Sequence, residues 1–152
     1  MSSAAPSRLF PALHRAVRLF IAGSSLYSQR MAEQFGLHPT DMQLLNLLEL
    51  LGPTTPGVLG RCSGLSSGGV TVVLDRLESA GYIRRSRNPA DRRSILIAVV
   101  PARQKKLTAS YATVQEQFRR VLGGFSDEEL ETVLRFFSAA NEARPPAAQE
   151  PD

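Results

Sequence analysis

Positively charged side chains gather in one short stretch of this sequence. Residues 84–106 hold eight of the chain's eighteen Lys and Arg and a single acid, Asp91. Clustered arginines attract phosphate groups, so this stretch has the charge expected of a surface that binds a nucleic-acid backbone. A solvated hairpin whose arginines only protect its edge from aggregation would have the same composition, and that alternative stays open at this point.

A helical pattern with one apolar and one open face comes directly before the basic stretch. Its apolar residues recur at helical spacing and predict a buried stripe of Val70, Val73, Leu74 and Leu77. We expect Ser66 or Ser67 to cap this helix and Gly81 to end it. The opposite face carries side chains short or polar enough to lie against another surface, namely Gly68, Thr71, Val72, Asp75, Arg76 and Ser79.

The sequence lacks the residue patterns that catalysis or metal binding requires. It has no Gly-rich phosphate loop with a lysine and no His–carboxylate or Cys–His spacing. His14 and His38 stand alone, which argues against a metal site. We therefore expect neither enzyme activity nor a cofactor.

The elements before the open-faced helix complete a helix-turn-helix pattern. Apolar periodicity predicts a long helix over about residues 7–35 and a second over 39–51. A short third helix should begin at Thr55 and stop at Gly64. This spacing is typical of a helix-turn-helix, in which the first helix braces the second and the second faces outward.

A hairpin and two further helices are expected after Gly81. The strands are predicted over residues 82–86 and 94–100, on either side of the turn-rich tip RNPADR. A helix follows over 102–122, and Ser126 with Glu129 forms a capping box that starts the last one. The fold class is therefore mainly α with a small β wing.

These elements predict one folded domain over residues 7–144. A winged helix-turn-helix core would span about 38–100, flanked by helices over about 7–35 and 102–144. The flanking helices carry apolar stripes that so small a core cannot cover, so we expect them to be dimerisation helices that pack against a second copy. A monomeric bundle in which the end helices fold back is the alternative.

The composition of the chain limits the size of its core, its partners and its compartment. The chain has 152 residues, of which 43% are hydrophobic, enough for one substantial core, and its net charge of +4 favours an acidic partner. Residues 1–6 and 145–152 are expected to be disordered. The single cysteine, Cys62, excludes an internal disulfide, fits a reducing compartment such as the cytoplasm, and is expected to fill space rather than sense oxidants. No apolar run has the length of a membrane span, so no membrane partner is expected.

The first helix has a competing interpretation. No acid precedes Glu33, whereas Arg8, Arg15, Arg18 and Arg30 do, as in an organellar transit peptide. Its apolar stripe continues to Phe35, however, and this length favours a helix that is retained.

Three segments carry a resemblance to a known family. They are GLHPTDMQLLNLLE in the second helix, TTPGVLGRCSGLSSGGVTVVLDRLESAGYIRR in the helix-turn-helix, and RNPADRRSILIAV in the wing. Together they resemble the MarR family (multiple antibiotic resistance regulators) of bacterial transcription factors, and Asp91-Arg92-Arg93 matches that family's D-x-R wing signature. The chain departs from the family pattern at residues 58–60, Val-Leu-Gly in place of Glu-Leu-Ala, and at Pro101.

The resemblance implies a homodimer that binds a pseudo-palindromic site in double-stranded DNA, most simply as a repressor. The open-faced helix that precedes the hairpin would face the major groove through Ser66, Ser67, Gly68, Thr71, Val72 and Arg76. Arg93 would enter the minor groove with Asp91 paired to it, and phosphate attraction would come mostly from Arg84, Arg85, Arg87 and Arg92. Because Gly68 and Gly69 offer no side-chain contacts, the wing is expected to carry much of the affinity.

An effector site is implied by the resemblance alone. A small amphipathic or phenolic molecule would enter between the dimer helices and the winged core, and Tyr27, Met31, Met42 and Tyr111 could line that space. Met and aromatic residues at helical spacing are more often plain core. A winged-helix protein-interaction module without specific DNA binding remains the alternative function.

Overall fold

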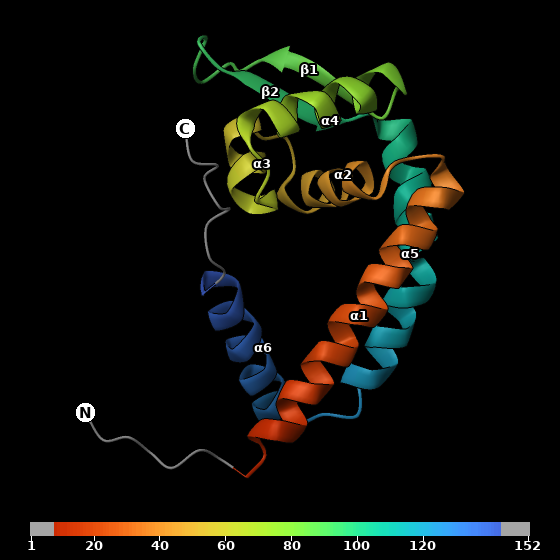
Figure 1. The fold of residues 1–152 in the computed structure, drawn as a ribbon, viewed down its shortest axis with the longest axis vertical. Coiled ribbons are helices and arrows are strands. Elements are labelled where there is room, and N and C mark those ends of the chain that lie inside the picture. Colours follow the sequence, from red (N-terminus) through yellow and green to blue (C-terminus); the bar gives the residue numbers. More distant parts are fainter. Residues whose placement is uncertain (1–7, 144–152) are drawn as a thin grey trace, which may run out of the picture. The chain divides into compact units, whose positions relative to one another are not determined.

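Six helices and one two-stranded hairpin make up the part of the chain that the computed structural model describes, residues 8–143 (Figure 1). The elements are α1 (Phe10–Phe35), α2 (Pro39–Leu51), α3 (Pro56–Ser63), α4 (Ser67–Ser79), β1 (Ile83–Arg87), β2 (Ile95–Val99), α5 (Pro101–Leu122) and α6 (Asp127–Glu142). This confirms the mainly α fold with a small β wing. The ends expected to be disordered, residues 1–6 and 145–152, lie outside the described residues.

The chain divides into two compact units, residues 1–43 and 44–152. The first contains α1 and the start of α2, and the second contains the remaining elements. The single domain expected over residues 7–144 stays a prediction. Across residues 8–143, no helix combines the length and hydropathy that crossing a membrane would need.

Local signals set the helix boundaries. The Ser66 hydroxyl accepts the Gly69 N–H at 3.2 Å, so Ser66 rather than Ser67 caps α4. Gly64 ends α3 with a φ of 79°, a left-handed conformation that suits glycine. The capping box predicted at the start of α6 is present, with Ser126 and Glu129 each bonding the other's backbone N–H.

The hydrophobic core of the second unit is built around α4. All four residues of the predicted stripe are buried, and Leu77 is 0% exposed. They share the core with buried side chains from α2, α3, the hairpin and α5, namely Leu44, Leu45, Leu48, Leu59, Ile83, Ile97, Val99 and Leu107. Burial of one side of α4 leaves its opposite side exposed.

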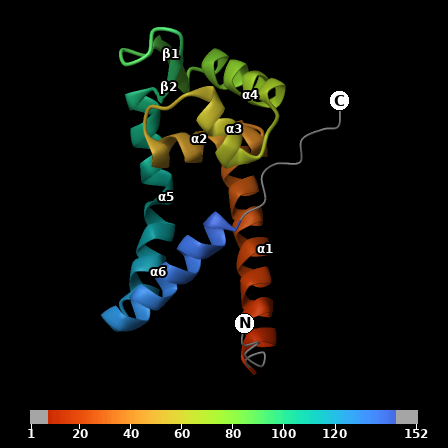
Figure 2. The same cartoon turned by 90° about the vertical axis from the view of Figure 1, so that its left-hand side faces the viewer.

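The hairpin is antiparallel, with Ile83 opposite Val99 and Arg85 opposite Ile97. Its strands begin and end within one residue of the predicted positions. Thr54 adds an isolated bridge to the edge of β2, where its N–H and carbonyl pair with Ile97 at 3.1 and 2.7 Å. The tip of the hairpin projects away from the helices of this unit (Figures 1 and 2).

The outer helices expose large apolar side chains. On α1 these are Phe10, Leu13, Leu19, Phe20, Ile21 and Leu26. In the second unit, α5 and α6 diverge from the Gly123–Gly124 turn (Figure 2), and they and the turn expose Phe118, Val121, Leu122, Phe125, Leu134, Phe136 and Phe137. The stripes that the sequence could not assign to the core are therefore uncovered in the single chain.

Candidate nucleic-acid interface

The outer face of α4 presents a row of small and polar groups. Every residue that sequence analysis assigned to the major groove is exposed: Ser66, Ser67, Gly68, Thr71, Val72 and Arg76. The Thr71 hydroxyl donates to the Ser67 carbonyl at 3.0 Å, which leaves its oxygen lone pairs as acceptors. Ser66 already accepts a bond from Gly69, so its hydroxyl proton remains available for a phosphate oxygen.

The hairpin tip holds its shape through its own hydrogen bonds. The Asn88 amide donates to the Ser94 hydroxyl at 2.9 Å and its oxygen accepts the Ala90 N–H at 3.0 Å. The Asp91 carbonyl accepts both the N–H and the hydroxyl of Ser94, each at 3.0 Å. The tip therefore presents the exposed side chains of Arg92 and Arg93 on a constrained loop.

Asp91 contacts Arg93 in a different way from the pairing that the resemblance implied. Its Oδ1 accepts the backbone N–H of Arg93 at 3.0 Å, as in an Asx turn. None of the ion pairs found within residues 8–143 joins the two side chains. Asp91 thus shapes the turn through the backbone and leaves the Arg93 guanidinium exposed.

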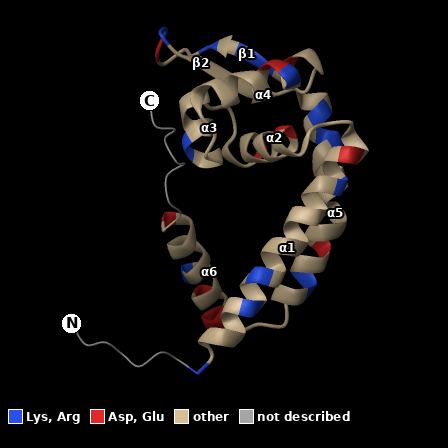
Figure 3. Cartoon of the chain, in the orientation of Figure 1, with Lys and Arg blue, Asp and Glu red and all other residues tan. Residues whose placement is uncertain are grey.

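Positive charge follows β1, which lies beside α4, and reaches the hairpin tip (Figure 3). Arg84 and Arg87 of β1 are exposed, as phosphate attraction requires. Arg85 is different, because it is half-buried and its guanidinium pairs with Asp75 and Glu78 of α4. The structure thus directs the Arg85 guanidinium at α4, and its role in phosphate attraction stays a prediction.

The four predicted effector residues are divided between the two units. Tyr27 is half-buried and Met31 and Met42 are buried in residues 1–43, whereas Tyr111 lies in residues 44–152. A common pocket for the four stays a prediction.

Tyr111 borders a cavity of about 330 Å³ between α2 and α5. Its hydroxyl donates to Asn46 Oδ1 at 2.9 Å, and the Thr108 hydroxyl donates to Glu49 Oε1 at 2.5 Å. Leu50 and Gln115 complete the lining. Asn46, Glu49 and Thr108 were not predicted from the sequence, although polar positions at spacings of three on α2 and α5 are a signal for them.

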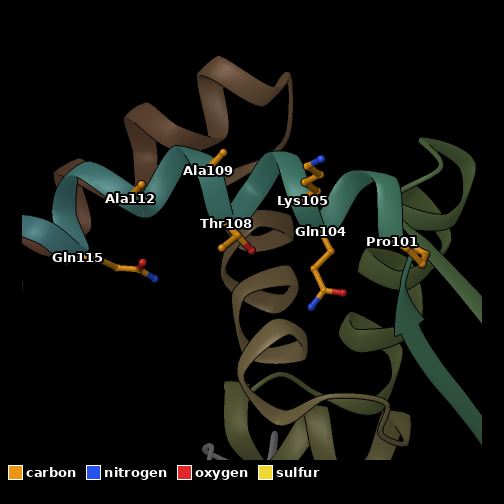
Figure 4. Close-up of a pocket in the computed structure, with 7 residues that line it drawn as sticks. All are labelled: Pro101, Gln104, Lys105, Thr108, Ala109, Ala112 and Gln115. Carbon is orange, nitrogen blue, oxygen red and sulfur yellow. The ribbon is translucent and has the colours of Figure 1, made fainter.

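A second hollow is a shallow groove of about 590 Å³ along one face of α5 (Figure 4). It is lined by Pro101, Gln104, Lys105, Thr108, Ala109, Ala112 and Gln115. Lys105 is the one charged group in this lining, so the groove offers no acid, histidine or cysteine for catalysis. Within residues 8–143 there is no cluster of three metal-ligating side chains, and Cys62 is half-buried on α3.

Comparison with known proteins agrees with this architecture. The sequence model of the MarR family matches residues 35–94. The uncharacterised HTH-type transcriptional regulator YcgE of Bacillus subtilis is 37% identical over 115 residues, which cover 76% of this chain and 75% of YcgE. The HTH-type transcriptional regulator MhqR of the same organism is 26% identical over 123 residues, 77% of this chain and 85% of MhqR.

Solved structures share the fold. A MarR family protein from Bacillus stearothermophilus superposes with a TM-score of 0.69 at 22% identity, over 91% of this chain and 97% of that one. A probable transcriptional regulator from Pseudomonas aeruginosa gives a TM-score of 0.51 at 30% identity, over 80% of this chain and 94% of that one.

Substitutions at Asp91 separate its backbone role from a charge-pairing role. Asp91→Ala removes the acceptor for the Arg93 N–H, so duplex affinity should fall between about two- and ten-fold, the usual worth of one hydrogen bond. Asp91→Asn keeps an acceptor oxygen and removes a negative charge, so it should bind at least as tightly as wild type. Fluorescence anisotropy with a labelled duplex measures both. Equal losses in the two variants would instead indicate an ion pair with Arg93.

Proposed function

Because the chain belongs to the MarR family of transcriptional regulators, we propose that it binds a pseudo-palindromic operator as a homodimer and represses transcription. The chain is a DNA-binding regulator rather than an enzyme. The observation that carries the proposal is the exposed, polar face of α4 beside the arginines of the hairpin. A repressor must share a compartment with the chromosome, so we infer a cytoplasmic location.

In this proposal α4 enters the major groove. Thr71 would accept a hydrogen bond from a base amino group, because its own proton is directed to Ser67. Val72, which is 53% exposed, would contact a thymine methyl group. Arg76 would bind guanine or a phosphate, and the hydroxyls of Ser66 and Ser67 would position the helix start on the backbone.

The hairpin would serve as the wing. Arg93, exposed at the constrained tip, would lie in the adjacent minor groove, where the negative potential of A·T-rich DNA attracts arginine. Arg84, Arg87 and Arg92 would supply phosphate attraction, and Asp91 would keep the tip in shape.

A second copy of the chain is the proposed cover for the outer helices. Phe118, Leu122, Leu134 and Phe137 line an apolar groove of about 600 Å³ between α5 and α6, and α1 exposes its own apolar stripe. Contiguous apolar patches of this kind are typical of obligate interfaces. A two-fold dimer would also present two α4 helices to the two halves of one operator.

The main test compares the duplex upstream of the protein's own gene with a random duplex of equal length. We expect tighter binding to the former, with affinity that falls steeply as salt rises. Arg93→Ala should weaken specific binding by about ten-fold or more. Arg135→Ala, which removes the same charge from α6, should bind like wild type. Sedimentation should give a dimer for all three proteins, and a lack of preference for the upstream duplex would contradict the proposal.

Gly68 gives a second test. A Cβ at this position would meet no atom of the protein within 4 Å, so internal packing does not require glycine there. Close approach of a phosphate to the start of the helix does require glycine at this position. Gly68→Ala should therefore raise the free energy of unfolding by up to about 1 kcal/mol and yet weaken duplex binding. Thermal melting and anisotropy measure the two effects, and unchanged affinity would argue against backbone approach at Gly68.

We also infer that a small amphipathic or phenolic effector releases the protein from DNA through the cavity beside Tyr111. The cavity supports this because it combines the apolar side chain of Leu50, at its exposed edge, with the paired polar groups of Tyr111 and Asn46. Titration of small phenols and weak amphipathic acids onto the protein–duplex complex should dissociate it for at least one compound. Tyr111→Ala should then require a higher concentration of that compound, while its affinity for DNA stays unchanged.

A further inference from the structure

One network of ion pairs joins the hairpin to α4. Arg85 of β1 holds its Nη2 2.6 Å from Asp75 Oδ1, and its Nη1 pairs with Glu78 Oε2. The other oxygen of Glu78 accepts the backbone N–H of Arg85 at 3.2 Å. Asp75 and Glu78 lie one turn apart on α4, so a single strand residue is held by two points on the helix.

Arg85 is the most enclosed member of the network. Its side chain is 28% exposed, compared with 59% for Asp75 and 39% for Glu78. Partial burial lowers the pKa of the guanidinium, but the hydrogen bonds that it donates to Asp75 and Glu78, together with the negative charges of these carboxylates, outweigh this and raise its pKa above the ordinary arginine value. The two ion pairs direct the Arg85 guanidinium at α4.

The network continues across the sheet. Arg85 lies opposite Ile97 in the hairpin register, and Ile97 in turn pairs with Thr54 ahead of α3. A chain of contacts thus runs from α4 through both strands to the segment before α3. If the network broke, β1 would keep its ladder with β2 but would lose its polar attachment to α4.

Asp75 also bears on the recognition surface. It lies on the exposed face of α4 that includes Thr71, Val72 and Arg76. A carboxylate at that place repels phosphate unless a cation accompanies it. Arg85 supplies that cation from the neighbouring strand.

We propose that Arg85 is a positioning residue for DNA recognition, which fixes the wing against the recognition helix and neutralises Asp75. The two elements then meet the duplex with a preset spacing, so that binding does not have to order the wing. The preset spacing raises affinity mainly for the specific DNA site, because only there must α4 and the wing both contact the duplex at defined positions. The inference rests on the proposed operator binding.

The central test uses a charge-conserving change. Lysine retains the charge of Arg85 but lacks the planar fork that reaches two carboxylates. Two probes are needed: a duplex enriched by the wild-type protein from a randomised library, and a scrambled duplex of the same length. Arg85→Lys should weaken binding to the enriched duplex about ten-fold and to the scrambled one less than about two-fold, with an unchanged salt slope. Arg135→Lys, at an exposed position on α6 outside the proposed DNA surface, should change neither affinity by more than about two-fold.

Asp75→Asn distinguishes a positioning role of Asp75 from simple repulsion of phosphate, because the two roles predict opposite changes in duplex affinity. If Asp75 only repels phosphate, its removal tightens binding to both duplexes. If it positions the wing through Arg85, its removal weakens binding to the enriched duplex. The double variant Arg85→Lys with Asp75→Asn should then bind about as Arg85→Lys does, because the two residues act as one unit.

The thermal stability of every variant is measured by melting, to show that it folds. If Arg85→Lys does not fold, Asp75→Asn still tests the inference, because Asp75 is exposed and its substitution leaves the core intact. Unchanged discrimination in Arg85→Lys would overturn the inference. So would an equal loss on both duplexes with a smaller salt slope, since that result identifies a direct phosphate contact. A wild-type protein that enriches no sequence at all contradicts the proposed operator binding instead, and this is measured before any variant.

Discussion

Burial of one side of α4 is the constraint on which the rest of the interface depends. Val70, Val73, Leu74 and Leu77 are all removed from water, so the rotation of the helix about its axis is fixed. The same burial places the hairpin, because the Leu77 carbonyl accepts the Tyr82 N–H at 2.9 Å and the Tyr82 carbonyl accepts the Val100 N–H at 2.8 Å. A change in the packing of this helix would move the outer face and the wing together.

The hairpin adds a second kind of rigidity, which is polar rather than apolar. Its base is held by the ladder and by Arg85, and its tip by the bonds of Asn88, Asp91 and Ser94. Side chains that satisfy backbone groups within a short loop reduce the number of conformations available to it. The arginines at the tip therefore extend into solvent from a support that is already ordered, which lowers the entropic cost of any contact they make.

Local patterns in the sequence predicted a large part of this arrangement. The buried stripe of α4, the capping box at Ser126 and both strands follow from spacings of a few residues, and all are present in the structure. Hydrogen-bond partners distant in sequence were not predictable in this way. Thr54 pairs with Ile97, and Tyr111 with Asn46, only because folding brings separate segments together.

Arg84 and Arg85 show how far the sequence alone predicts the role of a residue. They are identical in composition and charge, and only the alternation of the strand distinguishes them, since Arg85 shares its face with the buried Ile83. That alternation was a usable signal for an inward-directed arginine. The identity of its partners was not, because Asp75 and Glu78 meet it only after the chain reverses at Gly81.

The exposed phenylalanines and leucines of α5 and α6 link the fold to the amount of protein in the cell. If these surfaces are covered by a second copy, the population of the covered form rises with the square of the free chain concentration when chains are scarce. The occupancy of any DNA site would then depend more steeply on synthesis and degradation of the chain than simple binding allows. Newly made chains would also expose this apolar surface until they dimerise, so dimerisation would compete with aggregation.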